Sequence, residues 1–302
     1  MIIKALELGE IDGFLDYCRK HRSLLDDSYL SDEDLAAFKL NAENPTYIAV
    51  NAQGDIAGAA SLILDDYARR GRKARLRILH AEPEDPAVYR GLLQAVLQHK
   101  AGLDKLNIFV PSANPGELSK LAAAGFKVER YSYLLIRDIG ELPDAGVPET
   151  FNLREFRPGA DEDVWCQVRN AGFARLQGSE TPVTPEMVKT MTAGADYIEN
   201  GMLLLYHGDK AVGVVRGSDD EYGGEPIMNI GPLALLPEYQ GKGLGRVLLR
   251  AALHTAKNNG YSRSILCVNA ENEQAKALYT GEGFREAESA VCCKYELNGS
   301  GV

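Results

Sequence analysis

Three glycines at every second position, Gly241, Gly243 and Gly245, stand between an apolar run and an amphipathic segment with helical spacing. Glycines at this spacing let the main chain curl so that successive N–H groups point into one space. A helix start adds unpaired N–H donors and a positive dipole end at the same place. Lys242 and Arg246 add two cationic side chains. The segment predicts a site for a pyrophosphate or a similar dianion, and the alternative is a tight, solvated turn between a strand and a helix.

Two other phosphate-binding loops do not fit this segment. A Walker loop needs Ser or Thr directly after its lysine, whereas Gly243 follows Lys242. The dinucleotide-binding fingerprint needs a third glycine at the position of Arg246.

A second pair of residues that could take part in binding or catalysis follows the next apolar run. Asn272 stands just before Glu273, where the N-cap of a helix is expected. Tyr279 comes seven residues later, about two helical turns, so both side chains project from nearly the same face. A phenol there could act as a general acid. The alternatives are that Asn272 is only a cap and that Tyr279 is only a core residue.

Together the two segments resemble the GCN5-related N-acetyltransferase (GNAT) family. Gln240–Gly245 resembles the family's acyl-CoA-binding motif, Gln/Arg-x-x-Gly-x-Gly/Ala, and Leu266–Phe284 resembles its second motif. The resemblance implies an α/β fold with two tandem GNAT-like domains, each a mixed, mostly antiparallel sheet flanked by helices. It also implies acetyl-CoA as cosubstrate. No metal is predicted, because none of the five histidines pairs with a cysteine or another histidine at metal-ligand spacing.

The resemblance implies a role for each of these segments. The strand ending at Leu236 would diverge from the strand 264–268, and pantetheine would lie in the gap. The Leu235 N–H would polarise the thioester carbonyl and hold the oxyanion, and Tyr279 would protonate the departing thiolate. The implied cofactor-binding residues are Leu233, Ala234, Leu235, Gln240, Gly241, Lys242, Gly243, Leu244, Gly245, Arg246, Asn272 and Tyr279.

No general base is predicted. Where some family members carry Glu, this chain has Asn229, which cannot hold a proton usefully at pH 7. A carboxylate of the preceding acidic stretch (Asp219, Asp220, Glu221 and Glu225) could act through water, although a solvated turn explains these residues equally. An amine that arrives deprotonated would need no base.

The order of predicted elements occurs twice along the chain. Gly125-Phe126 and Asn114 match Gly283-Phe284 and Asn272 at an offset of 158, on either side of a linker at 141–150. We expect a domain at 1–143 and a catalytic domain at 151–297. The same offset places the glycine loop on residues 82–87, which hold two prolines and three acids, and Tyr279 on Leu121. The first domain is therefore predicted to be a degenerate GNAT-like domain without CoA chemistry.

Composition favours a globular cytoplasmic protein. Of 302 residues 45% are hydrophobic and 25% charged, with a net charge of −10, which disfavours nucleic acid and anionic membrane as partners. The N-terminus has acids where a signal peptide would be apolar, and five cysteines without a CxxC pair suggest reduced thiols. A basic run at 69–77 predicts a solvated hairpin rather than a nucleic-acid patch.

The residues and the resemblance together predict an N-acetyltransferase. It would transfer acetyl from acetyl-CoA to a primary amine of a small molecule or peptide by direct attack. The alternative from another class is a non-catalytic acyl-CoA-binding or sensing protein. Neither the acceptor nor the oligomeric state is predicted.

Overall fold

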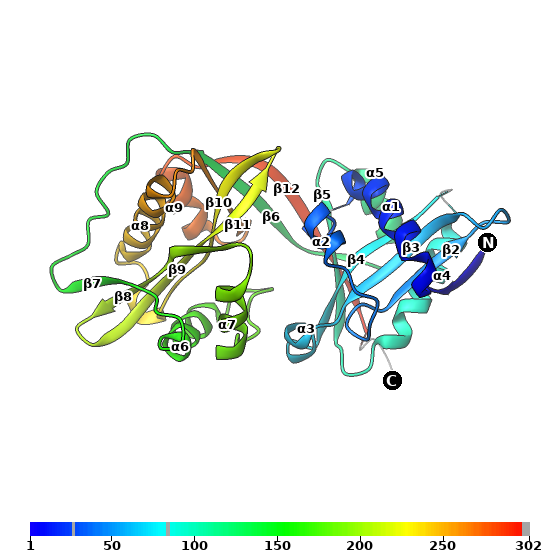
Figure 1. The fold of residues 1–302 in the computed structure, drawn as a ribbon, viewed down its shortest axis with the longest axis horizontal. Helices are drawn as coiled ribbons and strands as arrows, with labels where there is room; N and C mark the ends of the chain where they lie inside the picture. Colours follow the sequence, from blue (N-terminus) through cyan, green and yellow to red (C-terminus); the bar gives the residue numbers. More distant parts are fainter. Residues whose placement is uncertain (26–27, 83–84, 298–302) are drawn as a thin grey trace. The chain divides into compact units, whose positions relative to one another are not determined.

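A computed structural model describes residues 1–25, 28–82 and 85–297. The chain forms two compact units, one of Met1–Ser132 with Ser289–Val302 and one of Tyr133–Glu288 (Figure 1). Each unit is an α/β structure, and its strands pair mostly antiparallel. This is the fold class expected from the sequence.

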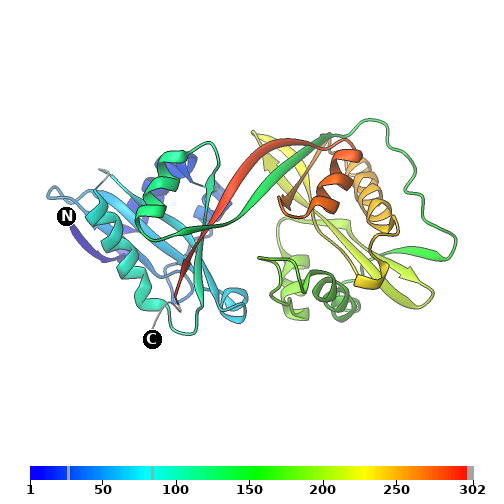
Figure 2. The same ribbon diagram turned by 180° about the vertical axis from the view of Figure 1, so that it is seen from behind.

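The first unit is a sheet with helices on both faces, in the strand order β1-β2-β3-β4-β5-β12. Helices α4 and α5 cover one face, and α1 and α2 pack on the other with a core of their own (Figures 1 and 2). Its elements are β1 (Ile2–Ala5), α1 (Ile11–His21), α2 (Asp32–Ala36), β2 (Thr46–Val50), β3 (Ile56–Ile63), α3 (Asp66–Arg70), β4 (Lys73–Ala81), α4 (Pro86–Val96), β5 (Lys105–Pro111) and α5 (Pro115–Ala123), with 3₁₀ turns at Leu8–Glu10, Arg22–Leu24 and Leu97–His99.

The second unit repeats this arrangement in the strand order β6-β11-β10-β9-β8-β7. Helices α8 and α9 lie on one face of its sheet and α6 and α7 on the other (Figure 1). Its elements are β7 (Phe151–Glu155), α6 (Glu162–Phe173), α7 (Pro185–Ala193), β8 (Tyr197–His207), β9 (Lys210–Tyr222), β10 (Glu225–Leu235), α8 (Leu244–Asn258), β11 (Arg263–Asn269) and α9 (Glu273–Gly281), with a 3₁₀ turn at Pro237–Tyr239.

The predicted repeat of elements is present in the structure. Strands β5 and β11 and helices α5 and α9 correspond at an offset of 158. Asn114 and Asn272 both cap the helix that follows, each accepting a hydrogen bond from the N–H three residues on. Gly125 and Gly283 both have positive φ, +97° and +87°, which a residue with a side chain rarely adopts.

The offset does not hold at the glycine loop, so that part of the predicted alignment is wrong. Gly58 pairs with Ala81 in the first unit, and Gly213 pairs with Leu235 in the second, so Ala81 corresponds to Leu235. Residues 82–85 then join β4 to α4, whereas residues 236–243 join β10 to α8, four against eight. The first unit therefore lacks half of the loop. Pro83 and Glu84 lie outside the described residues.

The boundary between the two units differs from the predicted linker. Strands β6 (Lys127–Asp138) and β12 (Arg285–Glu296) each contribute residues to both units, and β12 pairs with β5 in the first unit from Ala290 to Glu296. The predicted linker instead belongs to the second unit and runs along α8. There Arg250 donates to the Asp144 carbonyl at 3.2 Å, and His254 Nε2 lies 3.0 Å from the Pro143 carbonyl.

A buried carboxylate joins the strands at this end of the first unit. Glu129 on β6, whose side chain is 2% exposed, forms ion pairs with Lys105 and Arg130 and accepts a hydrogen bond from Asn107 at 3.0 Å. Cys292 on β12 lies 3.7 Å from the same carboxylate. Three strands therefore share one buried charge network.

We expect Glu129→Gln to destabilise the first unit by about 3 kcal/mol, because Lys105 and Arg130 would lose a buried counter-charge. Urea unfolding of the full chain measures the change. Glu296→Gln is the control, because Glu296 pairs with Lys294 at the surface. Equal stability of the two variants would contradict a structural role for the network.

The basic run at 69–77 lies on the predicted hairpin, in the connection between the antiparallel strands β3 and β4 and on β4, and Arg69, Arg70 and Arg72 are exposed. Part of it forms α3, and Arg72 makes two hydrogen bonds to Asp104, at 2.8 and 2.7 Å. The Arg75 guanidinium lies between the rings of Tyr29 and Phe109, 4.5 and 4.4 Å from their centroids. The hairpin is therefore solvated at its turn, whereas Arg75 on β4 packs against aromatic rings of the first unit.

Candidate active site

Strands β10 and β11 pair only at their beginnings. Parallel pairing joins Met228 to Ser264 and Asn229 to Ile265, and in the described part of the chain it extends no further. Strand β10 continues to Leu235 along β9, with an irregularity between Ile230 and Leu233. A gap thus opens between the two parallel strands, as the resemblance implied.

The free backbone groups of β10 face this gap. The Leu236 N–H donates to the Val212 carbonyl of the neighbouring segment at 2.9 Å. Because N–H directions alternate along an antiparallel strand, the N–H groups of Leu233 and Leu235 point away from β9. They are thus available to an extended ligand in the gap, in the manner of an added strand.

The glycine loop opens onto the start of α8. Gly241 and Gly243 have φ of +71° and +81°, and a Cβ built on either would find no heavy atom within 4 Å. The N–H groups of Gly241, Lys242 and Gly243 find no acceptor among the residues that the structure describes. The N–H groups of Leu244 and Gly245 find no acceptor there either, whereas the Arg246 N–H donates to the Gly243 carbonyl at 3.0 Å. A row of exposed donors therefore leads into a helix of 15 residues.

The third glycine has a different role. A Cβ on Gly245 would lie 3.3 Å from a methyl carbon of Leu278. This glycine therefore allows α8 to pack closely on α9, which places the loop beside the second motif.

The two cations of the loop are held by neighbouring groups. Lys242 Nζ lies 5.3 Å from the centroid of the Tyr239 ring. Arg246 Nε lies 2.9 Å from Glu282, whose side chain is 5% exposed and also holds Arg250 at 2.9 Å. The Arg246 side chain remains 50% exposed. Both cations thus stay near the loop, and Glu282 partly offsets the charge of Arg246.

Asn272 is the N-cap that the sequence predicted. Its Oδ1 accepts a hydrogen bond from the Ala275 N–H at 3.2 Å. Its amide NH₂ donates to no group in residues 1–25, 28–82 and 85–297, so a role as cap leaves this donor available to a ligand.

Tyr279 is largely a core residue, as its alternative interpretation stated. The residue is 9% exposed, and its ring packs edge-on against Phe284 at 6.1 Å between centroids. Burial raises the pKa of the phenol to about 12, so the group is protonated at neutral pH. The hydroxyl has no hydrogen-bond partner in the described part of the chain, which leaves its proton available.

The position of the missing base is occupied by a hydrogen-bonded pair. The Asn229 amide donates to Asp220 at 2.8 Å, and Asp220 also accepts from the Glu221 N–H at 2.8 Å. Asp219 accepts from the Tyr261 hydroxyl at 2.7 Å. The acidic stretch lies at the surface, at the end of β9 and the turn into β10. The structure therefore brings Asp220 to Asn229 without assigning a base.

Sequence reasoning missed two contacts beside the gap. Gly172 on α6 lies so close to β10 that a Cβ there would be 2.8 Å from the Leu235 carbonyl oxygen. After α6, the Gln177 carbonyl accepts a hydrogen bond at 2.9 Å from Asn269, the last residue of β11. The segment 172–177 thus contacts the ends of both diverging strands. No local pattern signals these contacts, because each joins residues more than 60 positions apart.

The corresponding part of the first unit is built differently. Helix α4 begins with Pro86, which has no N–H, and Asp85 caps the next residue by accepting from the Ala87 N–H at 2.8 Å. The hydroxyl of Tyr17 lies 2.7 Å from Nδ1 of His80, and the His21 ring stacks on His80 at 4.2 Å. In the first unit these three aromatic side chains pack against one another.

This histidine pair makes the first unit sensitive to acid. Burial, followed by the nearby His21, lowers the pKa of His80 to about 4. The unfolded chain binds a proton below about pH 6.5, while folded His80 stays neutral. Stability is therefore complete above pH 6.5 and falls as the pH drops towards 4, by up to about 3 kcal/mol. Thermal unfolding measured from pH 7.5 to 4.5 should show this fall, and His80→Gln should flatten it. An unchanged profile in the variant would contradict the assignment.

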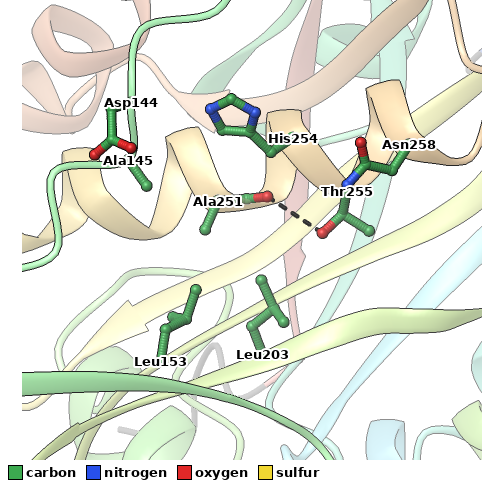
Figure 3. Close-up of a pocket in the computed structure, with 8 residues that line it drawn as sticks. All are labelled: Asp144, Ala145, Leu153, Leu203, Ala251, His254, Thr255 and Asn258. Atoms are coloured by element: carbon green, nitrogen blue, oxygen red, sulfur yellow. Dashed lines mark hydrogen bonds between the residues drawn. The ribbon is translucent and has the colours of Figure 1, made fainter.

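A hollow elsewhere in the second unit is separate from these residues. Figure 3 shows it between the later turns of α8 and the leucines of β7 and β8, with Asp144 and Ala145 at its rim. Its α8 residues begin at Ala251, two turns beyond the glycine loop.

No helix among the described residues combines the length and apolarity of a membrane span. Within the same residues, no three His, Cys, Asp or Glu side chains form a metal-binding group.

Solved structures share this fold over nearly the whole chain. A GCN5-related N-acetyltransferase from Sphaerobacter thermophilus has a TM-score of 0.71 at 18% identity, covering 98% of this chain and 95% of that one. A tandem GNAT protein from the clavulanic acid biosynthesis pathway has a TM-score of 0.69 at 16% identity, covering 99% of both. The fold is that of two tandem GNAT-like domains, as predicted.

Comparisons of the sequence point to the same family as the fold. Residues 173–284 match the acetyltransferase (GNAT) family. A mycothiol acetyltransferase of Paenarthrobacter aurescens (strain TC1) is 29% identical over 297 residues, which cover 93% of this chain and 86% of the relative. Another, of Catenulispora acidiphila, is 28% identical over 207 residues, which cover 66% of this chain and 65% of the relative. Residues 173–284 thus match a GNAT domain, the chain is an acetyltransferase, as predicted, and it is similar in sequence to the mycothiol acetyltransferases.

Proposed function

We propose that the second unit transfers an acetyl group from acetyl-CoA to a primary amine of a small molecule or peptide. The proposal rests on one observation: backbone N–H groups without an acceptor in the described residues form a continuous series around the gap. The gap-facing N–H groups of Leu233 and Leu235 lead to the open loop at Gly241 and Gly243, and the loop leads to the first turn of α8. Such a row matches the order of thioester, pantetheine and pyrophosphate in one extended cosubstrate.

Each part of the row has a chemical task. The loop and helix N–H groups, with Lys242 and Arg246, bind the pyrophosphate. Pantetheine lies along Leu233, Ala234 and Leu235, and the Asn272 amide donates to it. The thioester carbonyl accepts a hydrogen bond from the Leu235 N–H, which stabilises the oxyanion as the amine attacks.

The transfer is a single addition and elimination. The amine nitrogen forms a bond to the carbonyl carbon, and the C–S bond of the thioester breaks. Tyr279 donates its proton to the departing thiolate, and the amine loses its proton to solvent or to a carboxylate such as Asp220 acting through water. The first unit, whose loop is shorter and whose helix start is capped by Asp85, takes no part in this chemistry.

The test is CoA release by the purified full chain with acetyl-CoA and a panel of primary amines. Because the relatives are named mycothiol acetyltransferases, an amine related to mycothiol is the first acceptor to include. Amine-dependent release of free thiol supports the proposal. Tight acetyl-CoA binding without release from any amine would favour the non-catalytic binding protein, and no binding would overturn the site itself.

A further inference from the structure

We infer that Gln240 and Gly172 are positioning residues, which fix Leu235 so that its N–H is the free donor in the gap. The inference rests on the proposed function, because it concerns the donor proposed to hold the oxyanion. Neither residue needs to touch the reacting atoms to have this effect.

Gln240 takes the place of the missing strand partner. Where β10 and β11 pair, gap-facing backbone groups have partners on β11, but at Leu235 the two strands have diverged. The Gln240 side-chain amide donates to the Leu235 carbonyl at 3.0 Å. In an extended strand the carbonyl and N–H of one residue point to the same side. The carbonyl of Leu235 is thereby satisfied, and its N–H remains for a ligand.

Gly172 restricts the same residue from helix α6. A Cβ at this position would lie 2.8 Å from the Leu235 oxygen, 3.0 Å from the Ala234 Cβ and 3.3 Å from the Leu235 nitrogen. Only glycine therefore allows this approach without moving the strand or the helix. Asn170, two residues earlier on α6, donates to the Val183 carbonyl and accepts from the Val183 N–H, both at 2.9 Å, which holds the end of the helix in place.

The two contacts restrain the Leu235 peptide in complementary ways. A hydrogen bond to the carbonyl keeps Leu235 extended, and the close helix prevents the peptide from turning. A donor held in place before the reaction stabilises charge without a reorganisation cost at the moment of attack. The expected consequence is a contribution to kcat rather than to the binding of CoA.

The experiment compares Gln240→Leu, which removes the donor at similar size, with Gln240→Arg, which keeps a donor. Gln240→Leu is expected to lower kcat by about 10- to 100-fold, with the Kd for CoA changed less than about threefold. Gln240→Arg should recover most of kcat. Gln167→Leu, the same change at an exposed position of α6, is the control and should behave as the unmodified chain.

Thermal unfolding of each variant separates positioning from stability. Gly172→Ala is the second probe and should lower kcat in the same way, with some loss of stability because the Cβ displaces Leu235. The inference is overturned if Gln240→Leu keeps full kcat, or if it raises only the KM for acetyl-CoA. If the unmodified chain itself shows no acetyl transfer, the proposed function has failed rather than this inference.

Discussion

Gly243→Asp is expected to weaken acetyl-CoA binding by about 1,000-fold, the largest effect among the predicted substitutions. A Cβ at Gly243 finds no atom within 4 Å, so the new carboxylate would stand in the open space where the pyrophosphate is expected. Repulsion between charges about 4 Å apart near a protein surface is about 4 kcal/mol, which corresponds to about a thousandfold change in Kd. Calorimetric titration with acetyl-CoA measures it.

Gly243→Asn separates charge from backbone conformation. Asparagine has nearly the shape of aspartate, and both tolerate the positive φ of +81° better than other side chains. The asparagine variant should therefore bind acetyl-CoA within about tenfold of the unmodified chain. If both variants lose binding equally, the loop has been distorted and the charge argument is wrong. If neither loses it, the pyrophosphate lies elsewhere.

Tyr279→Phe is expected to lower kcat by about 100-fold, because a positioned general acid contributes at least this much to a rate. The substitution removes only a hydroxyl that has no hydrogen-bond partner within the described residues. Folding stability and the Kd for CoA should therefore stay the same. Steady-state kinetics with a good acceptor amine, together with CoA titration, measure both quantities.

The pH profile provides a second measurement for Tyr279. With the pKa raised to about 12 by burial, the phenol keeps its proton throughout the range in which the enzyme can be assayed. Below about pH 10, no fall in kcat should trace to this group. Tyr197→Phe, the same change elsewhere in the second unit, is the control and should leave kcat unchanged. Loss of CoA binding in Tyr279→Phe, with kcat intact at saturation, would show that the residue only shapes the pocket.

Local features of the site were readable before the structure. The spacing of Gly241 and Gly243 predicts their exposed N–H groups, because backbone freedom depends on the residue itself and its neighbours. Asn272 was expected to cap α9 for the same local reason, and it does. The repeat at an offset of 158 held where strand and helix lengths were kept, and it failed at residues 82–85, where the loop is shorter.

The remaining properties depend on contacts between distant parts of the chain. The boundary between the units lies within β6 and β12 rather than in the predicted linker. Residues 143–144 of that predicted linker contact α8 instead. A strand's hydrophobic pattern specifies that it must be paired and partly buried, but it does not specify which edge accepts it.

The sequence alone predicted a dianion-binding loop at a helix start, a second motif beside it, and a first half without that loop's composition. Only the tertiary structure decided what surrounds Leu235. Gln240 reaches back to it from the loop, and Gly172 meets it from a helix more than 60 residues away. The physical reason is that loop and cap geometry depend on neighbouring residues, whereas the packing of α6 on β10 depends on the whole unit being folded.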